Sequence, residues 1–206
     1  MFSQLDITRM PSPTPSKRTA SAAVLRRQRM DQLESTVKAC LRKADAVDAA
    51  QQAKLQDALS RWLDEADPSS RHDLFATLAE ALQRTYPRLS AARHFDTSAV
   101  ASAFARSLLE HGQQVVAREA ARAGHANTYD TLSIWIENEA DSAVLESLGQ
   151  VLCRSPADLR TALGRLRHRL LQRVNASLAI WSDSPTARQN LRRRLRDALL
   201  SSETSA

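Results

Sequence analysis

Apolar residues recur at spacings of three and four along most of the chain, with polar residues between them. The stretch from residue 21 to residue 46 shows the pattern with Val24, Leu25, Met30, Leu33, Val37 and Leu41. This is the period of an amphipathic α-helix, whereas a half-buried strand alternates at every second residue. The pattern therefore predicts an all-α protein.

Prolines and capping residues divide the pattern into separate helices. Ser155-Pro156 and Ser184-Pro185 each place a capping hydroxyl before a proline at the first helical position, which favours a helix start. Pro87 is expected to end an earlier helix, because proline cannot continue one. We predict a single helical bundle of about six to eight helices over residues 21–200.

The first 20 residues differ in composition from the rest. They are rich in Ser and Thr and contain Pro11, Pro13 and Pro15, a composition that cannot pack as a helix or strand. We predict a disordered leader over residues 1–20 and a disordered tail over residues 201–206. The leader resembles the unfolded signals of bacterial type III secretion substrates, although an ordinary disordered tail has the same composition, and a mitochondrial transit peptide is a further alternative.

The positive charge lies at the C-terminal end. The net charge is +6, yet residues 1–153 contain 18 basic and 19 acidic side chains, whereas residues 154–206 contain 11 arginines and 4 acidic residues. A sequence pI near 10.0 favours anionic partners such as nucleic acid, an acidic protein or a membrane surface. Arginine outnumbers lysine 25 to 4, which fits recognition of phosphate or carboxylate and equally a GC-rich genome.

Motifs for catalysis, cofactors and metals are missing from the sequence. Only four glycines are present, and no phosphate-binding loop, dinucleotide fingerprint, HExxH site or serine elbow occurs. The five histidines stand singly, and Cys40 and Cys153 lack zinc-site spacing, so we expect two buried free thiols. We therefore expect no enzyme, cofactor or metal.

The apolar runs also bear on location. None approaches the roughly 18 residues that span a bilayer, so we expect no transmembrane segment. We expect a bacterial cytoplasmic protein, or one exported by a specialised secretion system through its leader.

Residues 144–171 contain the one local motif with a functional interpretation. Their sequence, VLESLGQVLCRSPADLRTALGRLRHRLL, resembles the helix-turn-helix of bacterial sigma-factor promoter-reading regions. Gly149 stands where a small residue is needed between the two helices, Leu148 and Leu152 are expected to face inward, and Ser155 and Leu159 cap and anchor the second helix. The motif departs from the family at Cys153, where glycine is usual.

The resemblance implies a helix-turn-helix unit over residues 141–171 and a set of DNA contacts. Arg160 and Thr161 would lie toward the bases, and Arg165, Arg167 and Arg169 would hold the DNA backbone. The final helix would add phosphate contacts from Arg188, Arg192, Arg193 and Arg196.

These arginines have other interpretations. They can bind an acidic protein, form the solvated face of a core helix, or pair with the acidic stretch that contains Glu137, Glu139, Asp141 and Glu146.

Two functions follow as hypotheses. The first is a non-catalytic bacterial interaction protein, working as a regulator, adaptor or secretion-associated effector-type factor that binds another protein. The alternative is a DNA-binding transcriptional regulator that uses the helix-turn-helix and the basic C-terminal helices. The sequence does not predict the oligomeric state.

Overall fold

The computed structural model describes residues 16–42, 48–65, 73–92, 95–182 and 184–203. These residues form nine α-helices and one 3-10 turn, with no strand among them, which confirms the all-α prediction. The elements are α1 (Ser16–Leu41), α2 (Ala49–Glu65), α3 (Leu74–Thr85), α4 (Pro87–Ala92), α5 (Thr97–Arg122), α6 (Ala126–Leu132), η1 (Ser133–Trp135), α7 (Ser142–Leu152), α8 (Pro156–Ala179) and α9 (Pro185–Glu203). Most of the predicted leader, residues 1–15, lies outside the described part.

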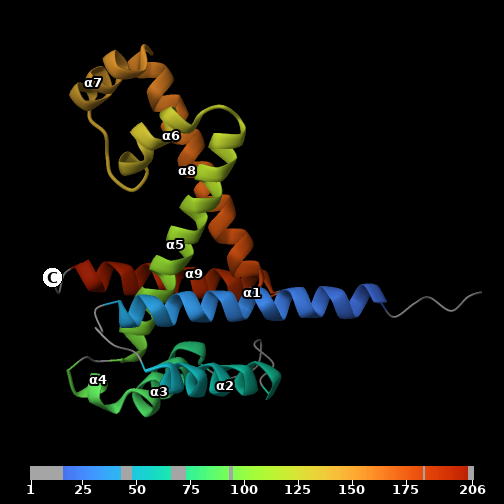
Figure 1. The fold of residues 1–206 in the computed structure, drawn as a ribbon. Coiled ribbons are helices and arrows are strands. Elements are labelled where there is room, and N and C mark those ends of the chain that lie inside the picture. The colour runs from blue at the N-terminus through green and yellow to red at the C-terminus, as the bar shows by residue number, and fades with distance from the viewer. Residues whose placement is uncertain (1–15, 43–47, 66–72, 93–94, 183, 204–206) are drawn as a thin grey trace, which may run out of the picture.

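The helices are arranged as a base, an arm and a head (Figure 1). We call α1 to α4 with α9 the base, the paired α5 and α8 the arm, and α6, η1 and α7 with the first half of α8 the head. In the base, α5 begins between α1, α3 and α9, all of which contact it. The arm then leads away from the base, and the head lies at its far end.

Two hydrophobic clusters correspond to the base and the head. The base cluster centres on side chains with almost no exposed surface, including Leu33, Phe75, Leu82, Phe104 and Leu178. The head cluster contains Val116, Ala120, Tyr129, Leu132, Ile136, Leu163, Leu166 and Leu170. Val174 packs against both clusters, so the arm is apolar along its length.

A glycine allows the two arm helices to approach each other closely. Gly112 is buried in α5, and a Cβ atom at this position would lie 2.8 Å from Cδ1 of Leu170 on α8. The sequence marks Gly112 as a weak helix former, but its position shows that the missing side chain makes room for α8.

Several helix starts agree with the sequence, and others differ. Ser155 caps α8, as its position before Pro156 predicts, and Asp141 caps α7. Pro87, which is expected only to end a helix, is also the first residue of α4, where its missing N–H group has no helical partner to lose. The helix that precedes it ends at Thr85.

The predicted burial of the two thiols is wrong. Cys153 is exposed in the turn after α7, and Cys40 is half-buried. Burial raises the pKa of the Cys40 thiol to about 11, which keeps it protonated at neutral pH.

Candidate functional site

The turn between α7 and α8 depends on two residues. Cys153 has φ 51° and ψ 45°, a left-handed conformation that glycine usually adopts. The Arg154 N–H group then donates to the Gly149 carbonyl at 3.0 Å. A Cβ atom on Gly149 would lie 2.7 Å from the Arg154 carbonyl oxygen, so the glycine is required by the turn itself.

The start of α8 follows the predicted pattern. The Ser155 hydroxyl accepts a hydrogen bond from the Asp158 N–H group at 3.1 Å and donates to the Asp158 carboxylate at 2.7 Å. Leu159 is fully buried and anchors the helix as predicted. On α7 the buried positions are Leu145 and Gly149, whereas Leu148 and Leu152, which were expected to face inward, are half-buried.

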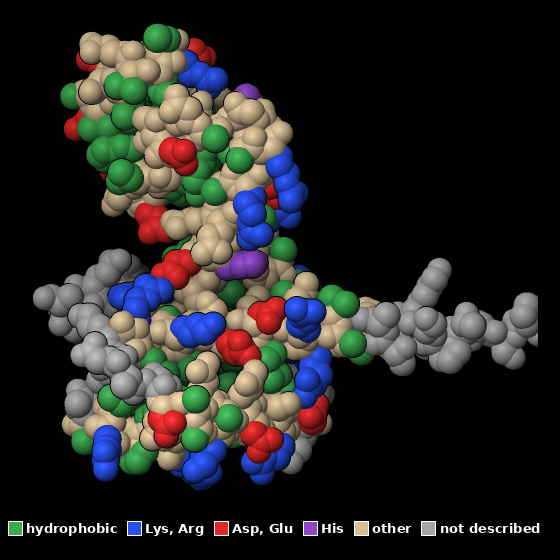
Figure 2. Space-filling model, viewed as in Figure 1, with side chains coloured by type: hydrophobic (Ala, Val, Ile, Leu, Met, Phe, Trp, Pro, Cys, Tyr) green, Lys and Arg blue, Asp and Glu red, His purple; other side chains and the backbone are tan. Residues whose placement is uncertain are grey.

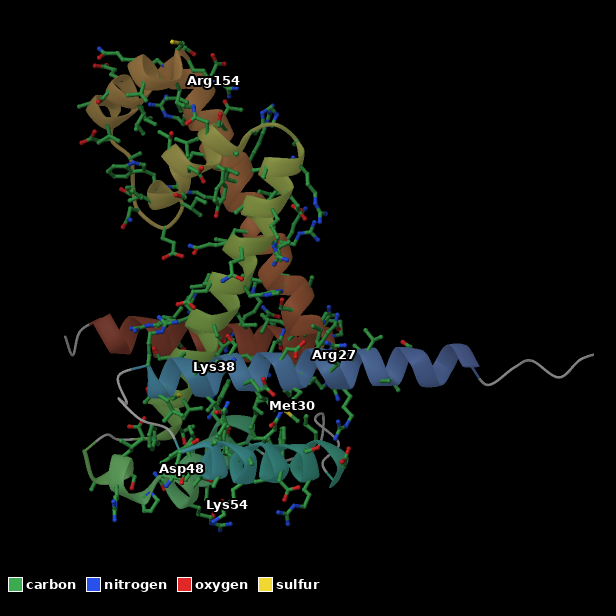
Figure 3. The ribbon with its side chains drawn as sticks, viewed as in Figure 1. Arg27, Met30, Lys38, Asp48, Lys54 and Arg154 are labelled. Atoms are coloured by element: carbon green, nitrogen blue, oxygen red, sulfur yellow. The ribbon has the colours of Figure 1, made fainter. Side chains whose placement is uncertain are left out.

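All five predicted contact residues of α8 are exposed, and Arg169 lies just past the middle of the helix. Arg160, Arg165 and Arg169 form no hydrogen bond or ion pair with any residue that the structure describes, and the Thr161 hydroxyl donates to the Ala157 carbonyl. A shallow hollow of about 320 Å³ is lined by Arg154, Asp158, Thr161, Ala162 and Arg165. Figure 3 shows Arg154 at the far end of the head.

Arg167 has a different environment from its neighbours. Its guanidinium group donates to the backbone carbonyls of Trp135 at 3.0 Å, Ile136 at 3.1 Å and Asn138 at 2.7 Å. These bonds join α8 to the segment that follows η1. The Nε and Nη2 donors of Arg167 are therefore used within the head.

Three of the four predicted residues on the final helix, Arg192, Arg193 and Arg196, lie elsewhere, beside a groove between α5, α8 and α9. The groove has a volume of about 650 Å³ and an apolar floor formed by Ala105, Leu108, Leu109, Leu171, Val174, Leu178, Leu195 and Leu199. Its polar rim consists of Gln189, Arg192, Arg193 and Arg196. We call this the arginine groove.

The rim of the arginine groove is positively charged. Arg192 and Arg193 are exposed and have no hydrogen-bond or ion-pair partner among the described residues. Arg196 lies 3.4 Å from Asp197, and both side chains are largely exposed, so water screens this pair. Arg188 is half-buried, and its Nε atom has no partner in the described part of the chain.

The predicted DNA-contact residues thus lie in two separate places, one on the head and one beside the arginine groove. Arg160 and Val174 are fourteen residues apart on α8, which is roughly 21 Å along the helix axis. The head arginines surround the start of α8, whereas Arg192, Arg193 and Arg196 face the groove where the arm meets the base. The structure does not bring the two groups together on one surface.

The acidic stretch after η1 does not pair with the C-terminal arginines in the described structure. Glu137 accepts a hydrogen bond from Gln113, and Asp141 caps α7. Among the described residues, C-terminal arginines pair instead with Glu119, which contacts Arg173, with Asp73, which contacts Arg194, and with Asp197, which contacts Arg196.

Sequence reasoning missed Leu171, which is 46% exposed although it belongs to an apolar pair. Leu170 points into the head cluster, so its neighbour must face another direction and lies on the groove floor. The sequence feature that could have identified Leu171 is the pair of adjacent leucines, because the rest of the helix has one apolar position per turn.

Apolar side chains are concentrated on one part of the head in the visible face. Figure 2 shows hydrophobic side chains gathered on the head over α6 and α7, and Lys and Arg side chains along the arm and base. Two of the exposed apolar residues in the head are Ile134 and Val151. The head surface is therefore mixed in character rather than uniformly basic.

The described residues contain no group of three or more His, Cys, Asp and Glu side chains placed to hold a metal ion. Among the described helices, none has both the length and the apolar character needed to cross a membrane. No match was found when the chain was compared with models of protein families, with curated proteins and with solved structures.

Proposed function

We propose that this chain is a non-catalytic bacterial interaction protein of the regulator, adaptor or secretion-associated class, and that its arginine groove binds an acidic amphipathic helix of a partner protein. The observation that supports this proposal is the combination of an apolar floor and a rim with three arginines in one groove. An amphipathic helix places apolar residues in such a groove and polar residues along its edges.

The charge of the rim selects the partner. Arg192 and Arg193 form no ion pair with a described residue, so a partner carboxylate would gain charge-assisted hydrogen bonds without breaking an existing pair. Arginine is suited to this role because its planar guanidinium group binds a carboxylate through two parallel hydrogen bonds.

The floor supplies the apolar part of the interaction. Leu171 is 46% exposed and lies beside Leu109 and Val174, which are half-buried. Covering such a surface removes apolar area from water, which favours association.

The groove composition favours binding over catalysis. The residues that line it are leucine, alanine, valine, glutamine and arginine. No carboxylate, imidazole or thiol is among them, so the lining offers no group suited to moving a proton or attacking a substrate at neutral pH.

A labelled peptide provides the direct test. We expect a helical peptide of about 18 residues, five turns, with a leucine stripe flanked by glutamates to bind the full chain saturably. Fluorescence anisotropy should show binding that weakens as salt rises, because the rim contacts are partly exposed. The same peptide with lysine in place of glutamate should bind at least about tenfold more weakly.

Matched variants locate the binding. The double variant Arg192→Glu/Arg193→Glu should bind the glutamate peptide at least about tenfold more weakly, because it reverses the charge of the rim. Arg88→Glu/Arg122→Glu makes the same net charge change on exposed residues of α4 and α5 and should have little effect. Leu171→Ser should also weaken binding, whereas Val151→Ser, at an exposed apolar residue in the head, should not.

Three results would contradict the proposal. They are the absence of saturable peptide binding, equal binding of the glutamate and lysine peptides, and equal effects of the groove variants and their controls. A second copy of the chain in the groove is the competing occupant. It would appear as a dimer in sedimentation that the Arg192→Glu/Arg193→Glu variant dissociates.

DNA binding by the head is the second candidate, supported by Arg154 and Arg165 beside one hollow at the end of the arm. Arg160 adds a third exposed guanidinium group on the same part of α8. Asp158, in the same hollow, opposes the approach of a phosphate.

The DNA candidate predicts that Arg160→Ala and Arg165→Ala weaken binding to duplex DNA, with log affinity falling linearly as log salt rises. The absence of binding at about 50 mM salt, where phosphate contacts are strong, would exclude it.

A further inference from the structure

The head has an apolar surface that the described fold leaves uncovered. Ile134 in η1 is 68% exposed and Val151 in α7 is 69% exposed, which makes them the most exposed of the large apolar residues that the structure describes. Trp135 and Leu148, from the same two elements, are half-buried and pack against the head cluster. Figure 2 shows hydrophobic side chains gathered over α6 and α7 on the visible face of the head. We call Ile134, Trp135, Val144, Leu148 and Val151 the head patch.

The composition of α7 is unusual for a helix at the edge of a fold. Its main contact is with α8, so the rest of the described structure leaves its other side open. A helix in such a position normally has polar residues on the open side. Glu146 is the single charged residue among the eleven of α7, and Val144, Leu148 and Val151 follow at spacings of four and three. Because Leu145 is the buried leucine of α7 and these three residues are half-buried or exposed, the apolar face is wider than the strip that α8 covers.

The segment that joins η1 to α7 is acidic. It contains Glu137, Glu139 and Asp141, and it borders the head patch because it connects the two elements that carry the patch residues. Residues 127–153 contain five acidic side chains and no basic one. Arg167 contacts this segment from α8, but its printed hydrogen bonds go to backbone carbonyls. None of the three carboxylates forms an ion pair with a described residue, so the border of the patch keeps its negative charge.

We infer that the head patch binds a basic amphipathic helix of a partner protein. The apolar stripe of that helix covers the patch, and its lysines and arginines lie near Glu137 and Glu139. Val144 and Val151 are seven residues apart, about 10 Å along α7, so a helix of three to four turns is long enough to cover the patch. The charge of the border selects this partner, since the same carboxylates repel the phosphate groups of nucleic acid and of an anionic membrane surface.

The head patch is separate from the arginine groove. The two surfaces share no residue, and their charged borders have opposite signs. The inference therefore does not rest on the proposed function. Together the two surfaces would let the chain hold an acidic helix and a basic helix at the same time, as an adaptor does.

The probe is a helical peptide of about 14 residues, four turns, with leucines at spacings of three and four and lysines beside them. In an NMR titration of the full chain it should shift the backbone amides of residues 133–151 saturably, with a dissociation constant on the order of 0.1 mM. A lysine peptide of the same composition with its leucines spread around the helix should bind at least about fivefold more weakly, because it has no apolar stripe. The glutamate peptide should neither shift these amides nor displace the probe.

Matched variants locate the probe on the head. The double variant Ile134→Ser/Val151→Ser should keep the urea midpoint of the wild type, because both side chains are exposed, and should bind the probe at least about fivefold more weakly. Leu171→Ser, on the floor of the arginine groove, should bind it normally. Glu139→Lys should weaken the probe at least about threefold. Glu146→Lys makes the same charge change about 140° around α7 from Val151 and should weaken it clearly less.

Three results of the titrations would overturn the inference. They are no saturable shift of the amides of residues 133–151 up to about 2 mM probe, equal binding of the two lysine peptides, and equal effects of Glu139→Lys and Glu146→Lys. A second copy of the chain is the competing occupant, and a dimer in sedimentation that Ile134→Ser/Val151→Ser dissociates would also overturn the inference. The groove proposal is measured with the glutamate peptide, so it can stand when this test fails.

Discussion

At Gly149, the missing side chain decides whether the α7–α8 turn can form. A Cβ atom there would lie 2.7 Å from a backbone oxygen, which cannot move without displacing the turn. We expect Gly149→Ala to lower the free energy of unfolding by about 1–2 kcal/mol, even though alanine is the better helix former.

Gly164 is the matched control for this experiment. It lies in α8, and a Cβ atom added there would meet nothing within 4 Å. Gly164→Ala should therefore raise the free energy of unfolding by about 0.5–1 kcal/mol through helix propensity. Urea unfolding of both variants measures the contrast, and a gain of stability in Gly149→Ala would contradict the geometry of the turn.

At Cys153, two residues before the α8 cap, we expect the opposite effect: removing the Cβ atom should stabilise the protein. Its positive φ places a Cβ atom where L residues are strained. Cys153→Gly should raise the free energy of unfolding by about 0.5–1 kcal/mol because glycine relieves that strain. Cys153→Ser retains the Cβ atom and should leave the urea midpoint near that of the wild type, which separates backbone strain from loss of the thiol.

At the scale of single elements, local patterns predict helix starts well when the capping residue and the first turn are adjacent in sequence. Ser155 and Asp141 are examples. The start of α5 is harder to assign from sequence, because Asp96, Thr97 and Ser98 are all capping residue types and only Asp96 accepts from the Ala99 N–H group. Neighbouring capping residues compete, and backbone conformation decides among them.

Arg167 shows what local patterns cannot predict. In the sequence it is one of several arginines on α8. In the structure its guanidinium group donates hydrogen bonds to three backbone carbonyls that lie about thirty residues earlier in the sequence. Those carbonyls belong to the last residue of η1 and to residues just after it, where the helical hydrogen bonds end and the oxygens need other donors. No spacing rule connects the two segments, so only the fold identifies this role.

Arg167→Gln should lower the free energy of unfolding by about 1–3 kcal/mol, because the charge-assisted bonds to the carbonyls are lost. Backbone amides near residues 133–140 should exchange faster in hydrogen-exchange measurements. Arg169→Gln, at an exposed arginine without a described partner, should change stability by less than about 0.5 kcal/mol. If the two variants behave alike, the carbonyl contacts do not stabilise the head.

At the scale of the whole molecule, the long apolar stripe of α8 serves two clusters. Leu163, Leu166 and Leu170 pack in the head, and Leu178 packs in the base. The sequence shows one continuous stripe, and helical periodicity does not reveal which neighbour covers each turn. The arginine groove is hidden for the same reason, since its floor combines residues of three helices.

The closure of the base by α9 gives a pH-dependent prediction. Arg194 donates to Asp73 at 2.6 Å and lies over the Phe75 ring, which ties α9 to the start of α3. Burial raises the pKa of Asp73, but the hydrogen bonds from Arg194 and from the Ala76 and Phe75 N–H groups together lower it below its usual value. The folded state therefore favours the charged carboxylate.

The sign of the stability change follows from that direction. The contribution of Asp73 is complete above its unfolded pKa of about 3.9 and is lost as the pH falls through the lower folded value. Urea midpoints of the wild type should thus fall more steeply between about pH 5 and pH 2 than those of Asp73→Asn, which retains an asparagine cap for α3. Arg194→Gln should reduce the same pH dependence, and the two substitutions together should cost less at pH 7 than their separate costs added. If the urea midpoints of the wild type and of Asp73→Asn change with pH in parallel, the contact between α9 and α3 is too exposed to stabilise the base.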